Sequence, residues 1–223
     1  MSEAQQDENS IEAPSAEFTG MGEVARAVLE ERPRFVLVSD DHITSEPQDV
    51  SASLVEALTQ SPTYQSGDVG FYVEALYNYA NPQTGDFSGG VIKWDEFHKG
   101  NPNGTNYRGA IQRAVESGVP VHGIDLDKRV DSEGEERMAH WKAQTDKGIE
   151  PIKILLIGAG HMWNDPKKTA DLMHRLGNNQ WAIQNERAYI PPGYSKVVNA
   201  DISQSVRTER KYKIVKYSNV PQK

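Results

Sequence analysis

Two aliphatic runs constrain the fold of this chain more than any other feature. They are VLVSDDH at residues 36–42 and ILLIGAGH at residues 154–161, and each ends in small or acidic residues followed by a histidine. Continuous Val, Ile and Leu are typical of a strand buried on both faces, as in a parallel sheet. Ligands bind beyond the carboxyl ends of strands in open α/β sheets. We therefore expect His42 and His161 at the carboxyl edge of the sheet, where ligands bind.

The rest of the chain alternates between strand and helix patterns. Val69 to Glu74 and the residues around 119–124 read as further strands, and 181–185 and 212–217 as strands near the end. Amphipathic segments between them predict helices, with short connections. Such alternation predicts an α/β fold, with a central, mainly parallel sheet flanked by helices. We expect one such domain over residues 19–223.

Residues 1–18 form a polar leader rich in Ser, Glu, Gln and Ala. A segment with so few large apolar residues is expected to be disordered, because it cannot offset the entropy of ordering. The same composition is typical of a type III secretion signal, and frayed termini share it. The chain has no cysteine, which excludes disulfides and thiolate metal sites. No apolar stretch is long enough to span a membrane.

The formal net charge of −8 argues against nucleic acid as a partner, because an acidic chain repels phosphate backbones. One basic cluster, RTERKYKIVK at residues 207–216, alternates with apolar residues. We interpret it as a solvated edge strand whose charges prevent aggregation.

Polar side chains end four of the predicted strands. Asp40 and Asp41 follow the first strand, Glu74 ends the second, Asp125 ends the third, and His161 follows the fourth. Carboxylates and imidazoles meeting at one edge can act as acid and base, or hold a divalent metal ion. Asp40, Asp41 and Asp125 are also plausible caps or ion-pair partners. Glu74 has the strongest functional case, because a carboxylate emerging from a buried strand costs free energy unless it is paired or used.

Other residues carry weaker signals. His122 is interpreted as a hydrogen-bonded histidine within a strand. For His98, which lies in a predicted loop, two interpretations stay open: it lines the site, or it has no part in it. The chain lacks the Gly-x-Ser-x-Gly elbow, the Walker loop, the His-Glu-x-x-His helix and a complete dinucleotide fingerprint. These common motifs of hydrolysis and nucleotide binding are therefore excluded.

Three short motifs resemble those of a known superfamily. It contains the erythromycin esterases, ChaN-like haem-binding lipoproteins, Tiki/TraB proteins and a domain of the Pasteurella-type dermonecrotic toxin. SDDH at 39–42 is similar to its Gly-Glu-x-His motif, FYVE at 71–74 to its strand-ending glutamate, and GAGH at 158–161 to its Gly-x-x-His motif. The first motif departs from the pattern, with Ser39 in place of glycine and Asp40 in place of glutamate. The size, the leader and the lack of cysteine also resemble bacterial type III effectors of the HopBA kind.

The resemblance implies a hydrolase-like site for ester, amide or peptide bonds in a small-molecule or peptide substrate. His42 is expected to be the general base, with Glu74 orienting it and His161 stabilising charge or joining a metal site. Asp40, Asp41, Asp125 and Arg137 are expected to orient these groups or to contact substrate. The resemblance is compatible with a divalent metal ion as cofactor but does not require one.

The biological role implied by the resemblance is that of an effector secreted into the host cell cytoplasm, where it triggers plant cell death. The altered first motif favours a rival. In that alternative the chain is a non-catalytic effector or binding protein that keeps the fold and holds haem or a host immune protein.

Overall fold

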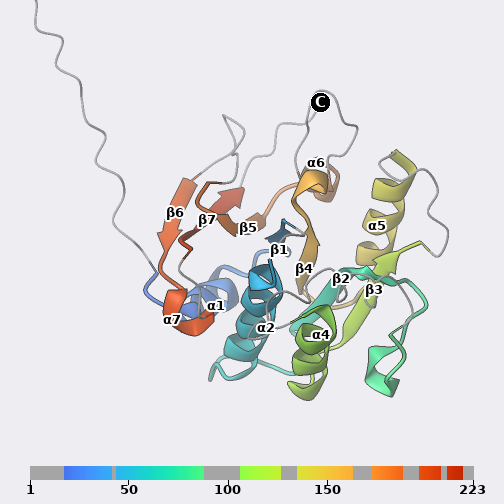
Figure 1. Ribbon diagram of the computed structural model, residues 1–223, viewed down its shortest axis with the longest axis horizontal. Coiled ribbons are helices and arrows are strands. Elements are labelled where there is room, and N and C mark those ends of the chain that lie inside the picture. Colours follow the sequence, from blue (N-terminus) through green and yellow to red (C-terminus); the bar gives the residue numbers. More distant parts are fainter. Residues whose placement is uncertain are drawn as a thin grey trace, which may run out of the picture.

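The computed structural model describes residues 18–41, 44–87, 106–126, 135–162, 172–187, 196–206 and 210–217. Its centre is one seven-stranded sheet in the order β3-β2-β4-β1-β5-β7-β6 (Figure 1). The first five strands in chain order pair in parallel, and β7 and β6 extend the sheet antiparallel. The expected mainly parallel α/β fold is therefore confirmed. The strands are β1 (Phe35–Asp40), β2 (Val69–Tyr77), β3 (Val121–Asp125), β4 (Ile152–Gly158), β5 (Gln180–Asn185), β6 (Lys196–Ala200) and β7 (Tyr212–Tyr217).

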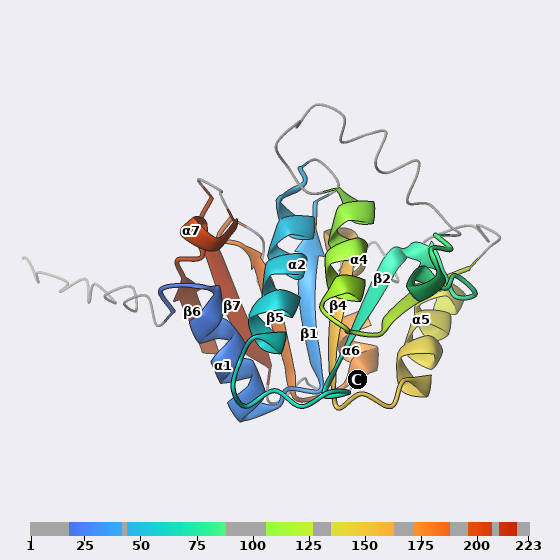
Figure 2. The ribbon, with the colours of Figure 1, turned by 90° about the horizontal axis from the view of Figure 1, so that it is seen from below.

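Helices cover both faces of the sheet (Figure 2). One face carries α1 (Met21–Glu31), α2 (Glu46–Thr59) and α4 (Tyr107–Glu116), and the other carries α5 (Glu135–Lys147) and the short α6 (Leu172–Leu176). The remaining elements are the short helix α7 (Ser203–Val206) and the 3-10 turns η1 (Pro82–Thr84) and η2 (Ala159–His161). Among the described residues, no helix is both long enough and apolar enough to cross a bilayer.

The two aliphatic runs are buried on both faces, as their composition predicts. Every residue of β4 is buried. In β1, Val36 and Val38 pack into the hydrophobic cluster that contains residues of α1, α2 and α4. Phe35 and Leu37 pack into the second cluster, which contains residues of α5 and α6. Because side chains alternate along a strand, a central strand between two helical layers needs apolar residues at every position. This explains why β1 and β4 lack an alternating pattern.

The chain reverses direction across the sheet at β1 and β4. The connection that leaves β1 runs through α2 on one face, whereas the connection that leaves β4 leads to α6 on the other face. β1 and β4 are direct neighbours, and Asp40 pairs in register with Gly158. In open α/β sheets such a switch point leaves a crevice outside the strand ends, where ligands bind. Both histidine motifs follow the strands that flank it.

The interpretation of residues 207–216 as an edge strand is wrong. β7 lies between β5 and β6, with Tyr212, Ile214, Val215 and Tyr217 buried. Its lysines are accommodated because their stems cover apolar surface. Lys216 places Nζ 4.3 Å from the ring centre of Trp181 and pairs with Glu31 at 2.7 Å. Among the described strands, the sheet edges are β3 and β6.

Candidate functional site

The buried carboxylate of Glu74 is the centre of a polar cluster at the carboxyl edge of the sheet. β2 continues three residues beyond Glu74, so the glutamate does not end the strand as expected. The regular pairing of β2 with β4 nevertheless ends at Val73, and the register with β3 shifts between Val73 and Tyr77. Glu74 therefore lies where the ladder becomes irregular, with only 6% of its surface exposed.

Three groups surround the Glu74 carboxylate. The backbone N–H of Gly158 donates to Oε2 at 2.6 Å, and Nη2 of Arg137 donates to Oε1 at 3.3 Å. Nε2 of His161 lies 3.6 Å from Oε1. Hydrogen-bond donors and a neighbouring guanidinium stabilise a buried carboxyl group. Glu74 is therefore held in place with Oε1 facing the imidazole of His161.

Arg137 links Glu74 to Asp125. Its guanidinium donates two hydrogen bonds of 2.9 Å to the two oxygens of Asp125, the last residue of β3. Trp141, one helical turn later on α5, donates its indole N–H to Asp125 at 3.1 Å and packs under the guanidinium at 4.6 Å. This bidentate geometry fixes the arginine in one orientation.

His161 is positioned by the same cluster. It ends the turn η2, and its ring stands edge-on to Trp141 at 5.1 Å. Its Nε2 faces the Glu74 carboxylate, which Gly158 and Arg137 hold in place. A histidine oriented in this way can stabilise negative charge that develops nearby.

Asp40 and Asp41 lie on the other side of Gly158 and have separate partners. Asp40 is fully buried and accepts hydrogen bonds from Gln48, at 3.1 Å, and from the hydroxyl of Tyr107. This arrangement ties β1 to α2 and α4. Asp41 is half-buried, accepts hydrogen bonds from Thr44, and pairs with Arg210 at 2.9 Å.

The structure therefore brings together four of the predicted site residues, Glu74, Asp125, Arg137 and His161. It places Asp40 and Asp41 at the same sheet edge but in other contacts. His42 and His98 lie outside the described residues. His122 contacts Glu150 at 2.9 Å and stacks on Tyr72, away from this cluster.

The described residues do not fit a metal centre. Among them, no three His, Asp or Glu side chains are grouped as ligands would be. The guanidinium of Arg137 already occupies the place between Glu74 and Asp125 that a cation would need. The positive charge beside these two carboxylates is therefore supplied by a protein side chain.

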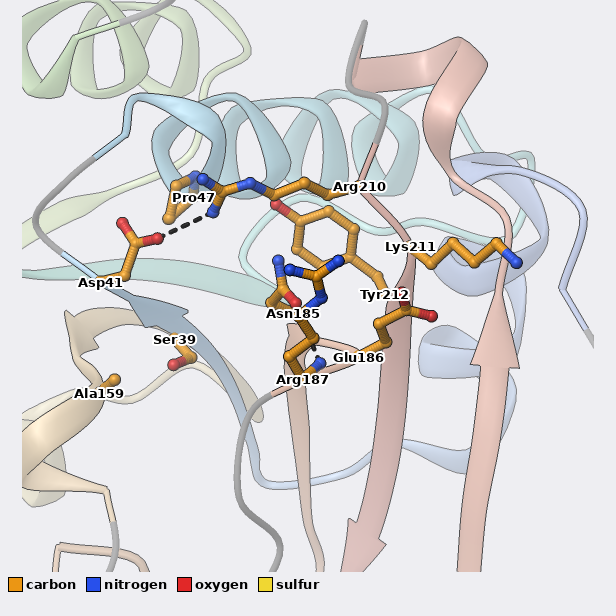
Figure 3. A pocket seen from close by; sticks show the side chains of 10 residues that line it. All are labelled: Ser39, Asp41, Pro47, Ala159, Asn185, Glu186, Arg187, Arg210, Lys211 and Tyr212. Carbon is orange, nitrogen blue, oxygen red and sulfur yellow. Dashed lines mark hydrogen bonds and ion pairs between the residues drawn. The ribbon is translucent and has the colours of Figure 1, made fainter.

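A pocket of about 550 Å³ opens next to Asp41, between the carboxyl ends of β1, β4 and β5 and the start of β7 (Figure 3). That volume is typical of sites for small molecules. Sequence reasoning missed most of its walls, because they come from segments far from the histidine motifs. The lining residues are Ser39, Asp41, Pro47, Ala159, Asn185, Glu186, Arg187, Arg210, Lys211 and Tyr212.

Comparison with known proteins gives no family. No family model matches the chain, and no curated protein matches it. The chain is similar in structure to the type III effector HopBA1, with a TM-score of 0.47 and 16% identity over 66% of this chain and 76% of that one. It is also similar to a structure described as "Bacterial protein toxins", with a TM-score of 0.44 and 12% identity. That match covers 77% of this chain and 38% of the toxin chain. Both likenesses concern the course of the backbone.

Proposed function

We propose that this chain is a bacterial effector with a hydrolase-like site, and that His161 and Glu74 form the core of that site. The reaction is hydrolysis: water adds to the carbonyl carbon of an ester, amide or peptide bond and the C–O or C–N bond breaks. The proton taken from water leaves with the alcohol or amine. The observation that carries the proposal is the buried Glu74 carboxylate, held by Gly158 and Arg137 and lying 3.6 Å from His161. A histidine oriented by a fixed carboxylate recurs in hydrolases of several unrelated folds.

Each residue has a distinct part in this reaction. His161, oriented by Glu74, stabilises the negative charge that develops on the carbonyl oxygen. Arg137 and Asp125 hold Glu74 in place, so the pair does not have to reorganise during the reaction. His42, which follows Asp41 at the end of β1, is assigned the removal of a proton from the attacking water. This assignment rests on the motif resemblance.

The effector role rests on the same resemblance and on the polar leader at residues 1–18. A secreted enzyme of this kind acts in the host cytoplasm, where its expression is expected to trigger cell death in plant tissue. Leakage of electrolytes from leaf tissue that expresses the protein measures that effect.

The test replaces His161 by glutamine and compares hydrolysis of 4-nitrophenyl esters and anilides with leaf electrolyte leakage. His122→Gln is the matched control, because His122 contacts Glu150 and Tyr72 away from the cluster. We expect His161→Gln to lose at least about tenfold in rate, as for the removal of one charge-stabilising donor, and to lose leakage. A His161→Gln protein as active as the His122→Gln protein would overturn the proposal.

A second candidate is a non-catalytic binding protein. It is favoured by the ion pairs that Arg137 makes with both carboxylates, bidentate at Asp125, since such pairs can be purely structural. The two candidates differ at Glu74. A binding protein tolerates the isosteric change Glu74→Gln, whereas an enzyme that uses the charge does not.

A further inference from the structure

Three cationic side chains line the pocket beside Asp41. They are Arg187, Arg210 and Lys211, and the acidic residues beside them are Asp41, Glu186 and Glu46, which pairs with Arg210. A cation in a concave site attracts ligands of opposite charge when no carboxylate neutralises it. The contacts of each cation therefore decide whether the pocket suits an anion.

The three cationic side chains differ in their contacts. Arg210 is tied between Asp41, at 2.9 Å, and Glu46, at 3.0 Å. Figure 3 shows the Lys211 side chain pointing away from the other lining residues, whereas the Arg187 guanidinium reaches in beside Tyr212. Within the described part of the chain, the side chain of Arg187 has no ion-pair partner. Arg187 is thus the cation available to a ligand.

Neutral donors stand beside this guanidinium. Asn185 uses its carbonyl Oδ1 to accept the backbone N–H of Arg187 at 3.0 Å, which leaves its amide N–H₂ for a ligand. The Ser39 hydroxyl lines the same pocket from β1, the strand paired with β5, and has no hydrogen bond within the described residues. A planar guanidinium with adjacent amide and hydroxyl donors matches the oxygens of a carboxylate or phosphate.

We infer that this pocket binds an oxyanionic group and that Arg187 is its principal ligand. The inference rests on the proposed hydrolytic function and deepens it, because Ala159 lines the pocket two residues before His161. The substrate class is then an ester or amide that carries a carboxylate or phosphate near the bond to be cleaved. The pocket holds the acidic end while the scissile carbonyl lies toward His161.

Binding is measured first, by calorimetric titration of the full chain with succinate and separately with inorganic phosphate. The two titrations distinguish a carboxylate from a phosphate ligand. We expect saturable binding of one of them, weakened about tenfold in Arg187→Gln, since a charge-assisted hydrogen bond carries that much affinity. Arg26→Gln on α1 is the matched control: it removes the same charge far from this pocket and is expected to change affinity less than about twofold. An absence of saturable binding by either anion, or equal affinities for both variants, overturns the inference.

Kinetics separate this inference from the proposed function. The Arg187→Gln change is expected to raise KM about tenfold for mono-4-nitrophenyl succinate and to leave KM for neutral 4-nitrophenyl acetate unchanged. If the protein binds succinate through Arg187 but hydrolyses neither ester, the anion-binding inference holds and the hydrolase proposal is wrong. If it hydrolyses both esters with KM values unaffected by Arg187→Gln, the hydrolase proposal holds and the anion-binding inference is wrong.

Discussion

Glu74 accepts a hydrogen bond of 2.6 Å from the backbone N–H of Gly158, the last residue of the strand that leads into His161. The bond joins β2 to the end of β4, at the point where their regular pairing has stopped. It fixes the carboxylate and the turn η2 relative to each other. The imidazole of His161 is therefore presented to Glu74 by the backbone as well as by its own side-chain contacts.

Arg137 is expected to be essential for the stability of this edge. Arg137→Gln leaves the buried Glu74 and the partly buried Asp125 without their shared cation, and removal of one partner from such a network costs about 3 kcal/mol. Urea unfolding at pH 7 measures the change. Arg34→Gln is the control, because the Arg34–Asp146 pair is exposed and contributes less than about 1 kcal/mol. Equal losses in the free energy of unfolding would show that the buried network contributes no more to stability than the exposed Arg34–Asp146 pair.

Gly123 is expected to be intolerant of any side chain. A Cβ there would lie 2.0 Å from the carbonyl oxygen of Tyr77, a backbone atom that cannot swing away. Gly123→Ala must push β3 from β2 and carry Asp125 away from Glu74, at a cost of about 2 kcal/mol or more. The thermal midpoint is expected to fall by several degrees, about 2–4 °C for each kcal/mol in a chain of this size.

Gly22→Ala is the control for that experiment. Gly22 lies in α1, and a Cβ added there would meet nothing within 4 Å, so alanine is expected to be neutral or stabilising. A Gly123→Ala protein as stable as Gly22→Ala would contradict the close approach of β3 to the Tyr77 carbonyl.

Glu150 is expected to make stability depend on acid pH. Burial alone would raise the pKa of Glu150, but hydrogen bonds from Tyr72 and His122 outweigh it and hold the pKa below its ordinary value of 4.5. A carboxyl with a lowered folded pKa contributes stability above its unfolded pKa and loses it as pH falls through the folded value. The protein is thus expected to lose stability as the pH falls below 4.5.

Tyr72→Phe tests this pH dependence, because it removes the 2.7 Å hydrogen bond that Tyr72 donates to Glu150. We expect a loss of about 1–2 kcal/mol at pH 6 and a smaller loss below the folded pKa of Glu150, where the carboxyl is protonated in both proteins. Urea unfolding from pH 6 down to pH 3 gives the comparison. A difference between the two proteins that stays constant over this range would rule out Glu150 as the titrating group.

Much of the fold was predictable because local patterns determine it. The runs before His42 and His161 are typical of buried parallel strands. The α/β architecture then predicts that the polar residues after these strands lie at the carboxyl edge of the sheet. The meeting of Glu74 with His161 was suggested by the motifs, and Arg137 was included on the same basis. Asp40 was expected to orient substrate or catalytic groups, yet its complete burial gives it a structural contact with Tyr107 and Gln48.

The pocket could not be predicted from the sequence. Its walls include Arg210, which pairs with Asp41 across 169 positions of the chain. That contact depends on β7 inserting between β5 and β6, and the basic alternation of residues 207–216 was equally compatible with an edge strand. Arg187 follows β5 directly, and only the parallel pairing of β5 with β1 brings it near Ser39.

If Glu74 and His161 act as one unit in hydrolysis, a double-mutant cycle between them must show strong coupling. The kcat/KM for the preferred 4-nitrophenyl ester is measured for Glu74→Gln, His161→Gln and the double variant. Glu56→Gln serves as a control carboxylate that is paired with Arg113 outside the site. We predict that each single change lowers kcat/KM at least about tenfold and that the double variant loses little more than either single variant. Losses that multiply in the double variant, or a Glu74→Gln protein as active as Glu56→Gln, would show that the two residues do not work together.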